Sequence, residues 1–167
     1  MYQKFLMACI RGEKQTVQEM IKDPKLDPTA GDNWAIMKAA DSDQFEIVEI
    51  LLKETNSNPS AHNNRPLSAA CRHCNIAGIN MLLSDNRIDP SAHENIAIIE
   101  AIVSGCKPAI TTLMKDQRVT NNLRKDIKHS VKSSGKFITN YPEHDDIIQD
   151  HIDRIVSLRK FANKNFS

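Results

Sequence analysis

The cysteine and histidine residues near the middle of the chain have the composition of a metal site. Cys71, His73 and Cys74 form a Cys-x-His-Cys run, and thiolate sulfur and imidazole nitrogen are ligands that zinc prefers. A structural zinc site needs about four ligands, which normally come from two such close pairs. The second pair is missing, because Cys9 and Cys106 each stand alone in the sequence. We therefore expect no metal site, with zinc or a disulfide as the alternative.

The C-terminal part of the chain carries a second group of residues that could bind a divalent metal. Its members are His144, Asp145, Asp146 and His151. Their His-Asp pairing resembles that of metal-dependent phosphohydrolases. Helical spacing gives a simpler reason for the acids, since Asp146, Asp150 and Asp153 would share one face and isoleucines the other. We predict an amphipathic helix over 143–162, and a small metal-dependent hydrolase is the alternative.

A motif built around proline recurs at a fixed interval through the chain. Pro28, Pro59 and Pro90 are 31 residues apart, in LDPTAGDNWAI, SNPSAHNNRPL and IDPSAHENIAI. A fixed period of this kind is the mark of stacked supersecondary units. Stacked units build a long shared surface, so the period favours binding over catalysis in a single pocket.

The same interval organises the apolar residues. The position that never varies is occupied by Ala8, Ala39, Ala70 and Ala101. Within one copy, Ile36, Ala39 and Ala40 have the helical spacing i, i+3, i+4, and a second helical run follows over 47–52. Each unit is thus two short helices and a loop, whose proline ends the second helix because it lacks an N–H. The small alanine side chain lets the first helices of neighbouring units stack closely.

We predict one all-α domain over 1–167, a solenoid of stacked helix-turn-helix repeats. The repeats are expected at about 1–27, 28–58, 59–89 and 90–120. Residues 121–167 are expected to hold a degenerate repeat and a C-terminal capping helix. The end of a stack needs such an atypical unit to cover its apolar face.

The run RPLSAAC at 65–71, followed by Leu82-Leu83, resembles the ankyrin-repeat pattern. The period is shorter than the ~33 residues usual for that family, and its loop glycine is replaced by Asn33, Asn64 and Asn95. Asparagine adopts positive φ more readily than most residues. We therefore expect a tight turn in place of the family's β-hairpin.

The resemblance implies a concave face, formed by loop tips and first helices, that binds another protein. Exposed positions that vary among the repeats are candidates for recognition, and Trp and Arg are the most frequent interface hot spots. The predicted partner-binding residues are Trp34, Met37, Lys38, His62, Arg65, Arg72, His73 and His93. Packing between adjacent loops is the alternative role for Trp34.

Two of the cysteines fall at a single position of the repeat. Cys9 and Cys71 share this position with Ala40 and Ile102, so we expect them to be small buried residues. We predict that all four cysteines are unpaired thiols. Unpaired thiols are typical of a reducing compartment, so a cytoplasmic location is expected.

The composition limits the class of partner. The formal net charge is +1, so no global field attracts nucleic acid. Basic residues gather at 124–136, where a solvated face and a docking patch both remain open. No apolar run approaches the ~20 residues that span a bilayer, and the first residues are interpreted as a repeat helix and not as a leader. We expect no membrane, no cofactor and no small-molecule substrate.

The predicted function is that of a non-catalytic protein–protein interaction module. The sequence holds no glycine-rich phosphate loop and no nucleophile elbow. Binding itself would be the activity of a stand-alone inhibitor or adaptor. The Asn-, Lys- and Ile-rich composition is similar to that of products of amoebae, large DNA viruses and phages, which favours a viral or phage antagonist of a host or defence protein. A self-assembling structural protein or homo-oligomer is a further alternative.

Overall fold

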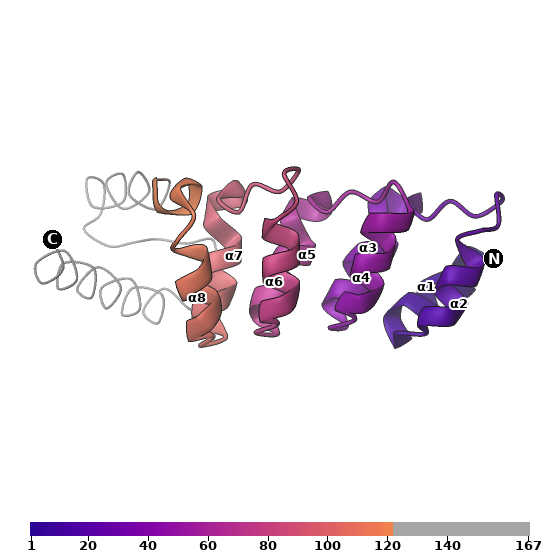
Figure 1. Ribbon diagram of the computed structural model, residues 1–167, viewed down its shortest axis with the longest axis horizontal. Helices are drawn as coiled ribbons and strands as arrows, with labels where there is room; N and C mark the ends of the chain where they lie inside the picture. Colours follow the sequence, from indigo (N-terminus) through magenta and orange to yellow (C-terminus); the bar gives the residue numbers. More distant parts are fainter. Residues whose placement is uncertain (122–167) are drawn as a thin grey trace, which may run out of the picture.

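The computed structural model describes residues 1–121, whose helices stand in four successive pairs (Figure 1). In chain order they are α1 (Tyr2–Arg11), α2 (Lys14–Met20), α3 (Ala30–Asp41), α4 (Phe45–Glu54), α5 (Ala61–Arg72), α6 (Ile76–Leu83), α7 (Ala92–Val103) and α8 (Lys107–Leu113). No strand occurs within these residues, and none of their helices is long and apolar enough to cross a membrane. The predicted all-α solenoid of helix pairs is confirmed.

Several predictions fall outside residues 1–121. These are the degenerate repeat after Asn121, the capping helix, the basic residues at 124–136 and the His-Asp group at 144–151. The exact repeat boundaries also stay predictions.

The first helices of the pairs form one layer and the second helices another. α3 packs against α1 and α5, and α5 packs against α7, so the first-helix layer is continuous. The second helices touch more sparsely, and α4 and α6 are the least closely packed pair among them. Neighbouring pairs therefore approach each other most closely on the first-helix side of the stack. The long loops run along one edge, at the top of Figure 1.

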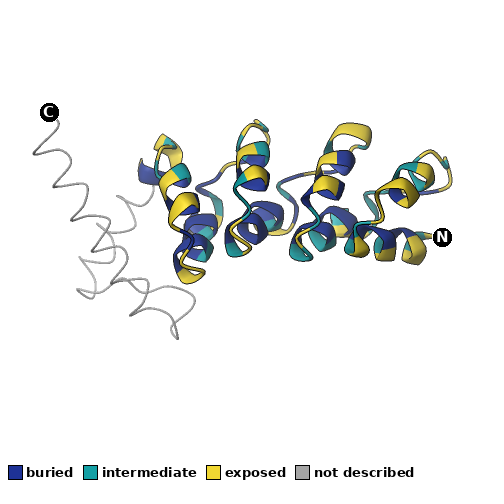
Figure 2. Cartoon of the chain, turned by 60° about the horizontal axis from the view of Figure 1, so that its bottom comes forward, coloured by how far each residue is buried: buried dark blue, intermediate teal, exposed yellow. Residues whose placement is uncertain are grey.

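The invariant alanines of the first helices are buried within the stack. Ala39, Ala70 and Ala101 are fully buried, and Ala8 is buried as well. In Figure 2, buried positions line the sides where neighbouring helices meet. A larger side chain at this position would push neighbouring pairs apart, which is the physical reason for its constancy.

Each helix pair is closed by the same left-handed turn. Gly12, Asp43, Cys74 and Gly105 occupy this position, with φ of 71°, 59°, 56° and 69°. The next residue then donates its backbone N–H to the carbonyl of the invariant alanine, for example Asn75 to Ala70 at 2.9 Å and Cys106 to Ala101 at 2.9 Å. This hydrogen bond folds the second helix back against the first.

The Asp-Pro-Ser motif is a hydrogen-bonded loop. Asp89 Oδ1 accepts the Ser91 backbone N–H at 3.0 Å and the Ser91 hydroxyl at 2.7 Å. Asp27 accepts the same two groups from Thr29 at 2.9 and 2.7 Å, and these bonds lower the pKa of Asp27. Asn58 can replace the acid because its amide oxygen is also an acceptor, and it binds Ser60.

A left-handed turn follows each of these loops and lies among the first residues within the bounds of α3 and α5. Gly31, Asp32 and Asn33 have φ of 68°, 57° and 64°, and the 62–64 turn repeats this geometry. The expected tight turn, with asparagine at positive φ, is confirmed. Asn64 then donates from Nδ2 to the Asp89 carbonyl of the next loop at 2.7 Å. Asn33 in turn accepts the Asn58 backbone N–H at 2.8 Å, so these two asparagines tie consecutive loops together.

Two arginines connect the later loops through hydrogen bonds. Arg87 donates through Nε and Nη2 to Asp85 and through Nη1 to the Ser57 carbonyl, at 2.9, 2.6 and 3.2 Å. Arg118 repeats this pattern with Asp116 and the Ile88 carbonyl. The hydrogen bonds from the arginines lower the pKa of Asp85 and the pKa of Asp116.

We expect these two acids to make the stability of the fold depend on acidic pH. Because their pKa values are lowered in the folded state, they stabilise the fold above their unfolded pKa of about 3.9, and this contribution is lost as pH falls through the folded values. Melting temperatures of the wild type and of Asp85→Asn/Asp116→Asn should therefore differ at pH 7, and the difference should shrink as pH falls below the unfolded pKa of about 3.9. An equal difference at every pH would contradict this account.

Candidate functional site

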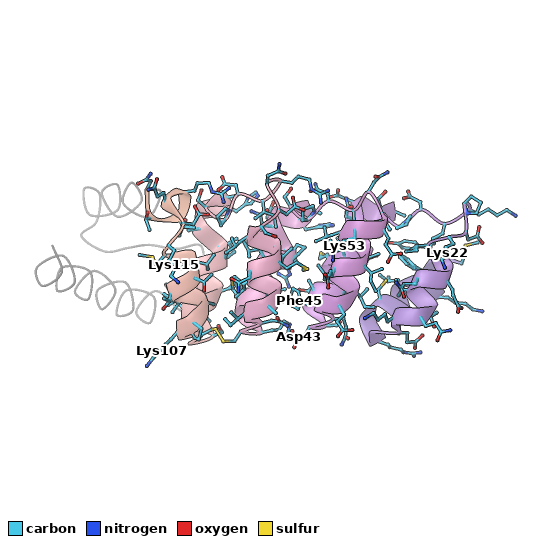
Figure 3. All side chains as sticks on the ribbon, viewed as in Figure 1. Lys22, Asp43, Phe45, Lys53, Lys107 and Lys115 are labelled. Atoms are coloured by element: carbon cyan, nitrogen blue, oxygen red, sulfur yellow. A yellow bond between two sulfur atoms is a disulfide. The ribbon has the colours of Figure 1, made fainter. Side chains whose placement is uncertain are left out.

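The turns that join the two helices of each pair contain a disulfide, which the sequence analysis kept only as an alternative. Cys74 and Cys106 are joined across the third and fourth helix pairs, with 5.4 Å between their Cα atoms, and Figure 3 shows sulfur at these turns, opposite the long loops. The prediction of four unpaired thiols was therefore wrong for these two residues. It remains correct for Cys9 and Cys71, which are free and buried.

The disulfide follows a rule of stacking that the period alone does not reveal. The residue of each left-handed turn meets the residue one place further along in the next pair, 32 positions away. Asn75 donates to Asp43 in this way at 3.0 Å, and the Gln44 side chain lies against Gly12. An offset of one period plus one residue was the signal that could have predicted the disulfide.

The three residues of the Cys-x-His-Cys run lie in three different environments. Cys71 lies in the core, where desolvation raises its pKa to about 12, and Cys74 is in the disulfide. His73 Nε2 lies 3.0 Å from the Asp41 carbonyl. Within residues 1–121, no three histidine, cysteine or acidic side chains form a group that could hold a metal.

Three predicted binding residues converge on Asp41 at the end of α3. Arg65 Nε and Arg72 Nη2 each donate to Asp41 Oδ1 at 2.8 Å, and His73 adds the contact to the Asp41 backbone. Asp41 and Arg72 occupy the same repeat position in adjacent units. The sequence analysis named the two arginines and missed the carboxylate that draws them together.

Three further predicted residues lie along α3. The Lys38 ammonium stands 5.7 Å from the centroid of the Trp34 ring, a cation–π arrangement. Trp34 packs beside Gly31 of its own left-handed turn and is still 44% exposed. Met37, on the same helix, is half-buried. Much of the Trp34 ring is therefore open to a partner.

The remaining two predicted residues lie at the loop tips. His62 and His93 begin equivalent left-handed turns, with φ of 48° and 51°. His62 Nε2 lies 3.8 Å from Asp32 of the preceding tip, and His93 is exposed. The structure thus places both histidines at the loop tips, whereas within residues 1–121 the ion pairs of Asp41 involve other side chains.

The exposed apolar side chains favour the same side of the molecule. All the large hydrophobic residues that are exposed in the described part lie on first helices or just before α1, namely Met1, Met7, Trp34 and Val103. We call the outward side of α1, α3, α5 and α7 the first-helix face. It combines apolar side chains with the Asp41, Arg65 and Arg72 cluster, a composition typical of a protein interface.

On the opposite side of the described residues, open clefts lie between α4 and α6. One of about 400 Å³ is lined by Asp43, Phe45, Gly78 and Met81, among others, and it lies in the area where Figure 3 labels Asp43 and Phe45. Glu49 lines this cleft and is paired with Lys53 at 2.6 Å. These clefts lack the exposed apolar residues of the first-helix face.

Stacked helix pairs joined by short turns define a helical repeat protein. A sequence model of ankyrin repeats, in three copies, matches residues 5–94, which is more than half of the chain. The chain therefore belongs to the ankyrin-repeat family. No curated protein and no solved structure matches it. Ankyrin repeats are generally protein–protein interaction modules and are typically non-catalytic.

The disulfide can be tested by counting thiols. In denaturant without reductant, we expect two reactive thiols per chain of the four cysteines present, and four after reduction. In the native protein Cys9 and Cys71 should not react, because burial raises the pKa of each to about 12. The Cys74→Ser/Cys106→Ser variant should give two thiols under both denaturing conditions. Four thiols in the unreduced wild type would contradict the pairing.

Proposed function

We propose that the protein binds a partner protein through its first-helix face and that this binding is its activity, as an inhibitor or adaptor. The main support is that exposed apolar side chains and the Arg65 and Arg72 pair occur on one continuous layer of helices. Membership of a family whose members generally bind proteins agrees with this proposal.

The biological setting remains part of the proposal. Antagonism of a host or defence protein by a viral or phage product rests on composition. The cytoplasmic location rested on four free thiols, and the Cys74–Cys106 disulfide removes half of that support. Cys9 and Cys71 are the thiols that stay free.

A capture experiment tests the proposal. Wild-type protein and the Trp34→Ala/Arg65→Ala/Arg72→Ala variant are used as bait in lysate from the source cells. We expect a stoichiometric protein partner with the wild type and its loss with the variant, because the variant removes the exposed ring and both guanidinium groups. Circular dichroism must show that the variant keeps its helix content.

The matched control removes three exposed charges from the second-helix side. Lys53→Ala/Lys107→Ala/Lys115→Ala changes residues of α4, of α8 and of the turn after it, all labelled in Figure 3. This control should retain the partner. A partner kept by the first-helix variant and lost from the control would contradict the proposal, as would dimers of the chain that form through the first-helix face and exclude a partner.

A further inference from the structure

We propose that the partner presents a linear segment with one carboxylate side chain between two apolar side chains. The carboxylate binds Arg65 and Arg72 beside Asp41, and the apolar side chains contact the α3 and α7 sides of the first-helix face. This inference rests on the proposed function and specifies the chemistry of the partner.

Apart from Arg11, whose guanidinium lies 3.7 Å from Glu13 in the turn after α1, the arginines of residues 1–121 fall into two groups by the use of their N–H donors. Arg87 uses Nε, Nη1 and Nη2 on Asp85 and a backbone carbonyl, and Arg118 does the same. Within residues 1–121, Arg65 donates through Nε only and Arg72 through Nη2 only. A guanidinium has five N–H donors in a planar fork. The pair on the first-helix face therefore keeps donors for a second acceptor, whereas the loop arginines are largely occupied.

The local charge also favours an anion. Arg65 and Arg72 share one oxygen of a single carboxylate, and Lys38 is three residues before Asp41 on the same helix. Two guanidinium groups thus share one acid, and Lys38, whose ammonium lies over the Trp34 ring, adds positive charge on the same helix. The side chains of Arg65, Arg72 and Asp41 are 40%, 33% and 20% exposed, so solvent and salt screen them less than fully exposed charges. A partner carboxylate would balance this excess through charge-assisted hydrogen bonds.

The apolar residues lie on both sides of this charged centre. α5, which carries both arginines, lies between α3 and α7. Trp34 on α3 is 44% exposed and Val103 on α7 is 39% exposed. Helix axes are about 8–10 Å apart, and Val103 lies seven repeat positions beyond Trp34, about 10 Å along the helices, so the path between them is about 19–23 Å. About six or seven extended residues cover this distance. We therefore place the acid near the middle of the segment, with an apolar residue about three positions away on each side.

A carboxylate fits this centre better than a phosphate. Arg65, Arg72 and Asp41 together carry a net charge of +1, which a singly charged carboxylate balances and a doubly charged phosphate would exceed. The apolar residues on either side would also be poor neighbours for the more strongly hydrated phosphate group. Phosphoserine in place of the acid is consequently expected to weaken binding.

The test uses a display library of random 12-residue peptides selected on the wild-type protein. We expect the selected peptides to share an Asp or Glu between apolar residues. Fluorescence anisotropy of one such labelled peptide should show about tenfold weaker binding to Arg65→Ala/Arg72→Ala. Lys53→Ala/Lys107→Ala removes the same charge from the second-helix side and should bind as the wild type does. Arg65→Gln/Arg72→Gln should behave like the alanine variant if the fold is intact.

A double-mutant cycle makes the contact specific. Replacing the peptide acid by its amide should weaken binding to the wild type about tenfold and should have little further effect on Arg65→Ala/Arg72→Ala. Binding should also weaken as salt is raised.

The two proposals fail in different ways. Selected peptides without an acid, or with equal affinity for Arg65→Ala/Arg72→Ala, overturn the inference, as does tighter binding of the phosphoserine peptide. If Trp34→Ala still weakens such peptides, the proposed function survives. Peptides that bind all first-helix variants equally overturn both proposals. A library that yields no binder overturns the inference of a linear segment.

Discussion

The close approach of the first helices at the invariant alanines is the constraint on which the rest of the structure depends. Ala39, Ala70 and Ala101 have no exposed surface, and their small side chains leave room for neighbouring helices to pack closely. The same alanines accept the hydrogen bond that closes each turn. One position therefore fixes both the spacing between units and the path within each unit, and small errors would repeat along the whole stack.

The spacing set by the alanines determines which side chains meet across units. At the turns it brings together Asn75 and Asp43, and one unit later Cys106 and Cys74. At the end of α3 it brings Arg72 to Asp41, its counterpart in the preceding unit. The loops are tied separately, through Asn64 and Arg87 to their neighbours. Structural ties occupy the turns and loops, and the exposed apolar residues lie on the first helices, which is why we propose the first-helix face for recognition.

The sequence was sufficient for whatever depends on a single repeat position. The period, the alanines and the prolines predicted the helix pairs, and asparagine predicted the left-handed turns, because each rests on local backbone chemistry. The disulfide and the role of Asp41 could not be predicted in this way. Cys74 pairs with Cys106 one place beyond the period, and Arg65 reaches Asp41 from a different repeat position. Such contacts depend on how far one unit is displaced along its neighbour, which a comparison of equivalent positions does not contain.

The central claim is that recognition takes place on the first-helix face, and hydrogen–deuterium exchange tests it most directly. Exchange would be compared for the chain alone and with the captured partner or selected peptide bound. The account predicts slower exchange in α3, α5 and the 62–64 turn, and little change in α4 and α6, because the bound segment would cover the first helices. Slower exchange confined to α4 and α6 would place the partner in the opposite clefts and would contradict the account.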